Sequence, residues 1–284
     1  MKTCKIAVIQ LHPKENEIES NHQRALKFIK EAADSGAQLA VLPEYHLADF
    51  FPSHDLSIRQ RCANWQKYLD AYCAIAKELN ICVVPGSLGE LHDDNTIVNA
   101  AYFIDNTGAI CGKYEKKNLW HSERGYVKGS KNETRHIAFD TPLGKVGLLI
   151  CWDLAFPEAF RELIVQGAKM VIVPAFWKYS DAGEVGMKRN PKSEGDFVDA
   201  AVVSRAFENT AAVVFCNVAG PPEEGYAGLS QVAMPFLGRV ERFENSEEGM
   251  RIVSVDMDVL EEAEAAYKIR EDIATSEWHY GYRQ

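Results

Sequence analysis

The chain has 284 residues and a formal net charge of −10, from 41 acidic and 31 basic side chains. This acidic balance disfavours nucleic acid or an anionic membrane surface as a partner, so we expect a small-molecule partner. No apolar run approaches the roughly 18 residues of a membrane-spanning helix, and the seven cysteines lack the regular spacing of a disulfide framework. We therefore expect a soluble, cytoplasmic protein.

The predicted elements repeat one plan in two halves of the chain, each running strand, helix, strand, helix, strand and then a hairpin. The elements expected in the first half are strands at 5–10, 36–44 and 80–89, helices at about 20–35 and 65–79, and a hairpin of 96–104 with 109–114. Those expected in the second half are strands at 145–151, 167–177 and 209–220, helices at about 157–166 and 196–208, and a hairpin of 230–235 with 238–243.

This repeat predicts the fold. Continuous apolar strands joined through helices are typical of parallel strands buried on both faces, and Gly36 and Gly167 stand where a helix C-cap glycine belongs. Two such sheets, each covered by two helices on one side, pack most economically sheet against sheet. We predict an α/β protein, a four-layer α-β-β-α sandwich of two internally similar halves. One domain is expected over 1–260, with a C-terminal helix and tail over 261–284 docked on it or on a dimer partner.

Two reactive side chains stand at the carboxyl ends of predicted parallel strands, where ligands collect in open α/β sheets. Glu44 follows Pro43 in the first half, and Cys151 follows an apolar run in the second. A thiol near its usual pKa of about 8.5 needs a base or a positive neighbour to act as a nucleophile, and a buried glutamate is a suitable base. Lys116 or Lys117 would supply the positive charge that stabilises a thiolate and an oxyanion.

Three motifs in this order resemble those of the carbon–nitrogen hydrolase, or nitrilase, superfamily, and the resemblance covers about residues 4–260. They are "AVLPEY" (40–45), "YEKKNL" (114–119) and "LLICWDLAFPEAFREL" (148–163). The resemblance implies Glu44 as general base, Lys116 as the catalytic lysine and Cys151 as nucleophile, a Glu-Lys-Cys triad. A second family glutamate, which positions substrate and the lysine, matches Glu123. Asn118 stands where the family usually has histidine.

The function that the resemblance implies is that of a cofactor-independent amidase acting on a small, non-peptide amide. Cys151 would attack the amide carbonyl while Glu44 takes its proton. Lys116 and the backbone N–H of Trp152 would hold the oxyanion, and ammonia or an amine would leave from a cysteine thioester. The letters "CWD" resemble the amidase branches more than the "CWEN" of nitrilases. Hydrolysis of a nitrile or an N-carbamoyl compound is the alternative among enzymes, and a catalytically silent binding or scaffold protein is the alternative outside them.

Aromatic residues beside the motifs are expected to line the substrate pocket; they are Tyr45, Trp120, Trp152 and Trp177. Ala155 occupies a position where many amidase relatives carry arginine, so a substrate carboxylate would need another partner. The candidates are Lys178, Lys188 and Arg189, in a polar stretch over 178–196 that is either a mobile lid or a solvated surface loop.

Other features have more ordinary interpretations. The eight histidines lack the spacing of a zinc site, so no metal and no other cofactor is expected. Asp153 is expected to cap a helix or to orient Lys116. The other six cysteines are expected to be buried without chemistry. The resemblance favours a homodimer or a larger homo-oligomer, formed through the helices after Cys151 and at 196–208.

Overall fold

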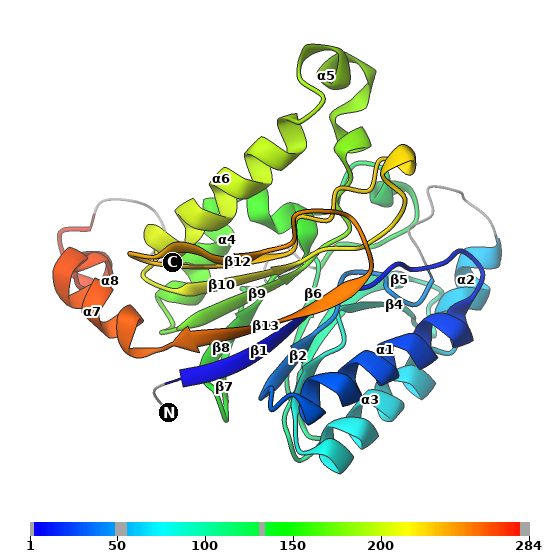
Figure 1. The fold of residues 1–284 in the computed structure, drawn as a ribbon, viewed down its shortest axis with the longest axis horizontal. Helices are drawn as coiled ribbons and strands as arrows, with labels where there is room; N and C mark the ends of the chain where they lie inside the picture. Colours follow the sequence, from blue (N-terminus) through cyan, green and yellow to red (C-terminus); the bar gives the residue numbers. More distant parts are fainter. Residues whose placement is uncertain (1–2, 49–55, 131–133, 279–284) are drawn as a thin grey trace.

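The computed structural model describes residues 3–48, 56–130 and 134–278. Two β-sheets face each other, and helices cover the outer face of each sheet (Figure 1). On the first sheet lie α1 (Ile18–Asp34) and α3 (Trp65–Leu79), and on the second lie α4 (Pro157–Ile164) and α6 (Ser193–Phe207). The predicted four-layer α-β-β-α sandwich is confirmed, with each of the four predicted helices within three residues of its expected start and end.

Each sheet has three parallel strands at its centre and antiparallel strands at its edges. The first sheet runs in the order β13 (Gly249–Asp256), β1 (Thr3–Gln10), β2 (Leu39–Val41), β3 (Cys82–Val84), β5 (Ile97–Ile104) and β4 (Ser87–Leu91), and β6 (Ile110–Glu115) also pairs with β5. The second runs in the order β12 (Gly238–Arg242), β11 (Gln231–Met234), β10 (Ala212–Cys216), β9 (Met170–Pro174), β8 (Gly144–Leu148) and β7 (Ala138–Thr141). Strands β1 to β3 and β8 to β10 are the parallel sets, as the repeat predicts.

The continuous apolar strands are buried on both faces because their side chains alternate between two cores. Ile6 and Val8 of β1 lie in the core between the sheets, whereas Ala7 and Ile9 pack on the side of α1 and α3. Fully burying a side chain of the size of valine or isoleucine stabilises the fold by about 1.5–3 kcal/mol. This double burial is why the strands show no alternation of apolar and polar residues.

The strands that carry the candidate residues are shorter than predicted. Strand β2 ends at Val41 and β8 ends at Leu148, so Glu44 and Cys151 lie in the segments beyond them. The single strand predicted over 80–89 is two strands, since Gly86, at φ 64°, turns the chain between β3 and β4. Because these strands end early, the backbones of Glu44 and Cys151 lie outside the hydrogen-bond ladders of β2 and β8.

The sequence pattern does not predict several of the observed elements. Strand β13 pairs with β1 over its whole length, from Thr3 opposite Asp256 to Gln10 opposite Gly249, although about 240 residues separate them. The pattern also does not predict strand β7 or the short helices α2 (Leu56–Cys62) and α5 (Gly183–Arg189).

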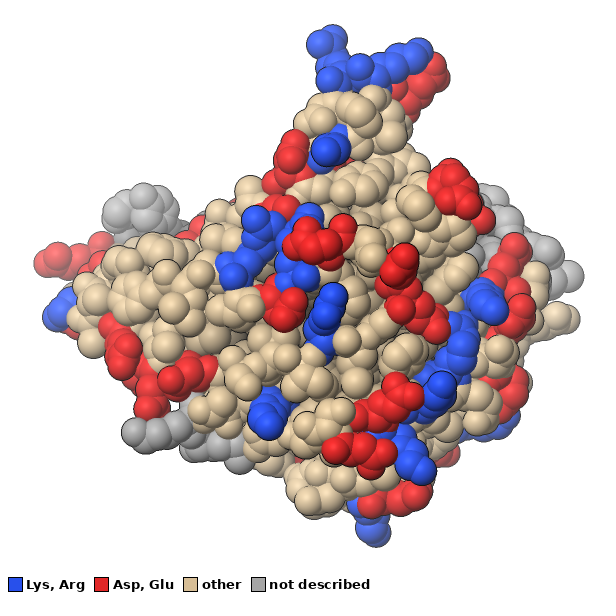
Figure 2. Space-filling model, in the orientation of Figure 1, with Lys and Arg blue, Asp and Glu red and all other residues tan. Residues whose placement is uncertain are grey.

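The C-terminal segment packs on this chain. Helices α7 (Asp258–Tyr267) and α8 (Ile269–Ala274) bury Leu260 and Ile273 in the core that contains the second sheet. The last part of the predicted tail, 279–284, lies outside the described residues. No helix in the described ranges is both long and apolar enough to cross a membrane. On the face drawn in Figure 2, acidic and basic side chains are interspersed.

The cysteines other than Cys151 follow the expected burial only in part. Cys4, Cys82 and Cys216 are buried, whereas Cys62, Cys73 and Cys111 are half-buried. All are free thiols.

Candidate active site

One cavity, of about 310 Å³, gathers the candidate residues from both halves of the sandwich. Glu44 reaches it from the segment after β2, Lys116 from the end of β6, and Cys151 from the segment after β8. The complete lining is Glu44, Lys116, Trp120, Ser122, Glu123, Cys151, Trp152, Phe176, Trp177, Lys178 and Asp181. The two halves therefore meet at the carboxyl ends of their parallel strands, where the pattern predicts a thiol and a carboxylate to lie.

A buried ion cluster forms one wall of this cavity. The Lys116 ammonium donates to Glu44 Oε1 at 2.8 Å and to Glu123 Oε2 at 2.7 Å. Each of the three residues is at most 2% exposed. Removing such charges from water costs several kcal/mol per ion, which a close ion pair with further hydrogen bonds offsets.

Those further hydrogen bonds come mainly from residues that the sequence analysis missed. Asn99, on β5, donates through Nδ2 to Glu44 Oε1 at 2.7 Å and to Glu123 Oε1 at 3.2 Å. The backbone N–H of Phe176 donates to Glu44 Oε2 at 2.9 Å, and the Tyr45 hydroxyl donates to Glu123 Oε1 at 2.9 Å. Each carboxylate is therefore held by several donors as well as by the lysine. Asn99 lies outside any motif, so only the packing of the segments reveals it.

Cys151 lies at a sharp turn. It begins a 3₁₀ turn, Cys151–Ala155, and has a left-handed backbone conformation with φ 46°. This conformation costs about 1–3 kcal/mol for a residue other than glycine and clusters at functional sites. The thiol is 7% exposed, and Sγ donates weakly to the Phe176 carbonyl oxygen at 3.7 Å. The turn thus directs the sulfur into the cavity rather than into the core.

Burial, and to a smaller extent the Glu44 carboxylate, keeps the proton on the Cys151 sulfur at rest. Burial raises the pKa of the Cys151 thiol well above its usual value; the Glu44 carboxylate raises it further, and Lys116 opposes them. Burial also raises the pKa of Glu44, against the effect of the lysine. Burial alone would lower the pKa of Lys116, but Glu44 and Glu123 outweigh it and hold that pKa above its usual range. A base in the cavity must therefore remove the thiol proton before the sulfur can react.

Comparison with known proteins identifies the family. The model of the carbon–nitrogen hydrolase family matches residues 5–265. The chain belongs to the carbon–nitrogen hydrolase family. It is 26% identical over 257 residues to a probable nitrilase of Schizosaccharomyces pombe, covering 89% of each chain. It is 28% identical over 262 residues to a 2-oxoglutaramate amidase of Bacillus subtilis, again covering 89% of each. A carbon–nitrogen hydrolase from Helicobacter pylori has the same fold, with a TM-score of 0.83, 20% identity and 95% of each chain covered.

Asp153 connects the segment that carries Lys116 to the turn that carries Cys151. Its Oδ2 accepts hydrogen bonds from the Ile150 N–H and the Tyr114 hydroxyl, both at 2.8 Å. Its Oδ1 accepts from the Asn118 side-chain amide at 2.8 Å and from the Asn118 N–H at 3.2 Å. The expected capping role holds for the 3₁₀ turn Cys151–Ala155, because Asp153 accepts from the N–H of Ile150, the residue before that turn; Asp153 does not cap α4, which begins at Pro157. Asn118, in place of the usual histidine, still ties the lysine segment to the cysteine turn.

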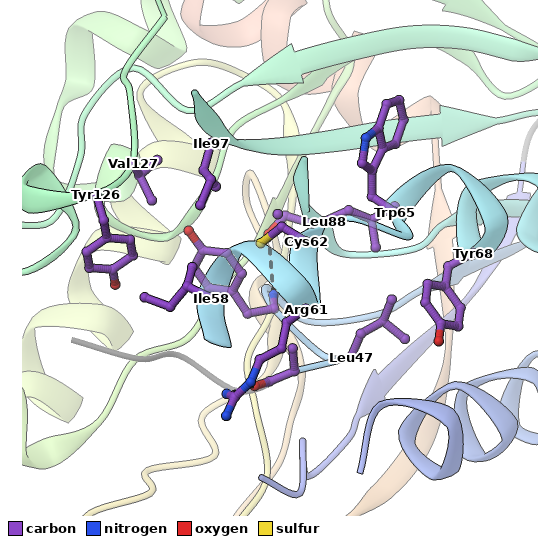
Figure 3. A pocket seen from close by; sticks show the side chains of 14 residues that line it. Leu47, Ile58, Arg61, Cys62, Trp65, Tyr68, Leu88, Ile97, Tyr126 and Val127 are labelled. Atoms are coloured by element: carbon purple, nitrogen blue, oxygen red, sulfur yellow. Dashed lines mark hydrogen bonds between the residues drawn. The ribbon is translucent and has the colours of Figure 1, made fainter. Parts of the chain in front are cut away.

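Three of the four predicted aromatic residues line the cavity. Trp120 and Trp152 pack edge to face with their ring centroids 4.6 Å apart, and Trp152 and Trp177 are 5.6 Å apart. Tyr45 does not line this cavity. It lines a separate one, mostly apolar, whose walls include Ile97, Cys62 and Tyr126 (Figure 3), and its hydroxyl donates to Glu123. Tyr45 is thus a support for Glu123, while the tryptophans form the walls.

The polar stretch over 178–196 is largely helical. It contains a 3₁₀ turn, Tyr179–Ala182, helix α5 and the start of α6. It lies at the surface, as one of the two interpretations expects, but it is helical rather than a loop. Lys178 lines the cavity, whereas Lys188 and Arg189 lie on α5 and do not line it. Asp181, which the sequence analysis did not single out, also lines the cavity. Whether this segment moves as a lid stays a prediction.

One group in the described part of the chain has metal-ligand types close together, away from this cavity. It consists of Glu90, His92 and Glu115. The Lys113 ammonium lies 2.9 Å from Glu90 Oε2 and 3.1 Å from Glu115 Oε1. A lysine therefore already supplies the positive charge that these carboxylates need.

Proposed function

We propose that this protein hydrolyses the carbon–nitrogen bond of small amides through a cysteine thioester, without a cofactor. The observation that carries the proposal is the buried Lys116 ammonium, held by Glu44 and Glu123 in the cavity that contains the Cys151 thiol. Charged groups buried this deeply contribute little to stability compared with apolar residues, and they cluster at catalytic sites. The amidases among the relatives support an amide as the substrate.

In the acylation step, Glu44 takes the thiol proton as Cys151 Sγ forms a bond to the amide carbonyl carbon. The carbonyl oxygen becomes an oxyanion, which the Lys116 ammonium and the Trp152 N–H stabilise. The tetrahedral intermediate then collapses and the C–N bond breaks. Glu44 returns its proton to the departing nitrogen, so ammonia or an amine leaves and a thioester remains on Cys151.

In the deacylation step, Glu44 takes a proton from a water molecule that attacks the thioester carbonyl. The C–S bond breaks, Cys151 regains its proton from Glu44, and the acid product leaves. Glu123 acts as a positioning residue, because its carboxylate accepts a hydrogen bond from the Lys116 ammonium and so orients it. Tyr45 and Asn99 position Glu123 in turn.

We also propose the assembly and boundaries that the sequence indicates. The catalytic domain spans 1–260, the extension spans 261–284, and the protein is a cytoplasmic homodimer formed through α4 and α6. Exposed aromatic side chains near the end of α6 support this interface. Phe207 is 40% exposed, and its ring centroid lies 4.9 Å from that of Tyr267, which is similarly exposed.

The proposal is tested by measuring ammonia release from a panel of amides, nitriles and N-carbamoyl compounds, with intact-mass detection of acyl adducts. We expect release from amides and a thioester adduct on the native protein, and neither on Cys151→Ala. Cys62→Ala, which removes a half-buried thiol from the second cavity, is the matched control and should keep both signals. Release from nitriles alone, or no release and no adduct from any compound, would reject the amidase.

A further inference from the structure

The cavity has a second pair of charged side chains that the proposed chemistry does not use. Lys178 and Asp181 both line it, three residues apart on the segment that follows Trp177. Neither belongs to the ion cluster of Lys116. Because both are half-buried, each has lost part of its hydration, and a substrate that fills the cavity would remove more of it.

The Lys178 ammonium is held by aromatic rings. It lies 3.8 Å from the ring centroid of Tyr226, which is 2% exposed, and 5.6 Å from that of Phe176. Within the described ranges, no carboxylate lies within ion-pair distance of it, in contrast to the two that hold Lys116. A ring face attracts a cation through its quadrupole but supplies no anion to pair with it. Since Lys178 is among the residues that line the cavity, an anionic group of a ligand is a suitable partner for it.

Asp181 offers the opposite charge. Its Oδ2 accepts a hydrogen bond from the Lys178 backbone N–H at 2.8 Å, and its Oδ1 accepts none from the described part of the chain. Burial raises the pKa of this carboxyl to about 6, with Glu194 adding to the shift and Lys178 opposing it. Near neutral pH the group is still mostly ionised. Its second oxygen can accept from a cationic group of a ligand.

We propose that Lys178 and Asp181 bind the α-amino-acid head of the substrate, so that the protein hydrolyses side-chain amides of amino acids. The carboxylate contacts the Lys178 ammonium, and the ammonium contacts Asp181 Oδ1. This inference rests on the proposed amidase function and names its substrate class. An acyl group with only a carboxylate would be repelled by Asp181, and one with only an ammonium would be repelled by Lys178. A neutral acyl group would leave both charges partly desolvated without a partner.

The test compares four amides of equal length. L-Glutamine carries both charges, glutaramate only the carboxylate, 4-aminopentanamide only the ammonium and pentanamide neither. We expect kcat/KM to be about 10- to 100-fold higher for glutamine than for pentanamide. This factor corresponds to the free energy that hydrogen bonds to charged groups typically contribute. The same comparison in the series one methylene shorter, based on L-asparagine, covers a different distance from the head to the amide.

Two conservative variants test which charged group of the substrate each of the two residues binds. Lys178→Met should abolish most of the advantage that the carboxylate confers, and Asp181→Asn most of the advantage of the ammonium. The matched controls are Lys188→Met and Glu184→Gln, which alter an exposed ion pair on α5. This helix projects from the top of the molecule, away from the sheets (Figure 1). Both controls should keep the native ratios of kcat/KM.

The outcomes separate the two proposals. If no amide yields ammonia or a thioester, the amidase itself is rejected. If amides are hydrolysed but neither series favours the doubly charged compound, or if the variants leave the ratios unchanged, the amino-acid site is rejected. If a variant loses all turnover, calorimetric binding of L-glutamine and L-asparagine to Cys151→Ala, with and without Lys178→Met, decides the matter. Weaker binding to the double variant supports the site, and equal binding overturns it.

Discussion

Replacing Lys116 by methionine should destabilise the protein as well as inactivate it. The substitution keeps an apolar chain of similar length but removes the ammonium that Glu44 and Glu123 share at 2.8 and 2.7 Å. Breaking a buried ion pair by removing one partner costs about 3–5 kcal/mol, because the remaining charge is buried without compensation. For a chain of this size, about 2–4 °C in melting temperature per kcal/mol gives a loss of about 6–20 °C.

A second substitution tests that reasoning. Lys116→Met with Glu44→Gln removes one of the two uncompensated carboxylates, so we expect the double variant to melt at a higher temperature than Lys116→Met alone. Without the lysine, the pKa of Glu44 rises further, so the folded state takes up a proton more readily than the unfolded state. The stability deficit of Lys116→Met should therefore shrink as the pH falls from 8 to about 5.

Thermal melts followed by circular dichroism, at several pH values and fixed salt, measure all three proteins. A loss of less than about 2 °C in Lys116→Met, against the expected scale, would refute the idea that the carboxylates depend on the lysine. So would a double variant no more stable than the single one.

Four further predictions concern the pH profile, the motif contacts, a close backbone approach and the assembly. Because burial raises the pKa of Glu44, kcat/KM should fall with decreasing pH at a pH above the usual range of a glutamate, and an acid limb at the usual glutamate value would contradict Glu44 as the base. Asp153→Asn loses acceptor capacity between the two motif segments, so steady-state kinetics should show kcat reduced by about 10-fold or more, as for misplaced catalytic groups, with little change in KM. Gly86→Ala would place its Cβ 1.8 Å from a backbone oxygen of the segment before Glu44, whereas Gly36→Ala meets nothing within 4 Å, so denaturant titration should find Gly86→Ala much the less stable of the two. Light scattering at micromolar concentration should give twice the mass of one chain, and a species of single-chain mass alone would reject the dimer.

The contacts of the candidate site could be predicted from the sequence only in part. The motifs identify Glu44, Lys116, Glu123 and Cys151 as candidates, and all four line one cavity. Asn99 could not be found in this way, because it lies on a buried strand without a motif. It contacts the two carboxylates only because β5 packs beside them. A motif describes neighbours along the chain, whereas a supporting donor can come from any segment that packs nearby.

What the sequence alone determined was the layered fold and the chemical types at the carboxyl ends of its strands. Both depend on local patterns: apolar periodicity, cap glycines and short motifs. Only the tertiary structure decided that β13 completes the first sheet, that the Tyr45 hydroxyl donates to Glu123, and that Lys178 lines the cavity. The physical reason is that burial, pKa and hydrogen bonding depend on which distant segments meet, and that information is absent from the order of residues within any one segment.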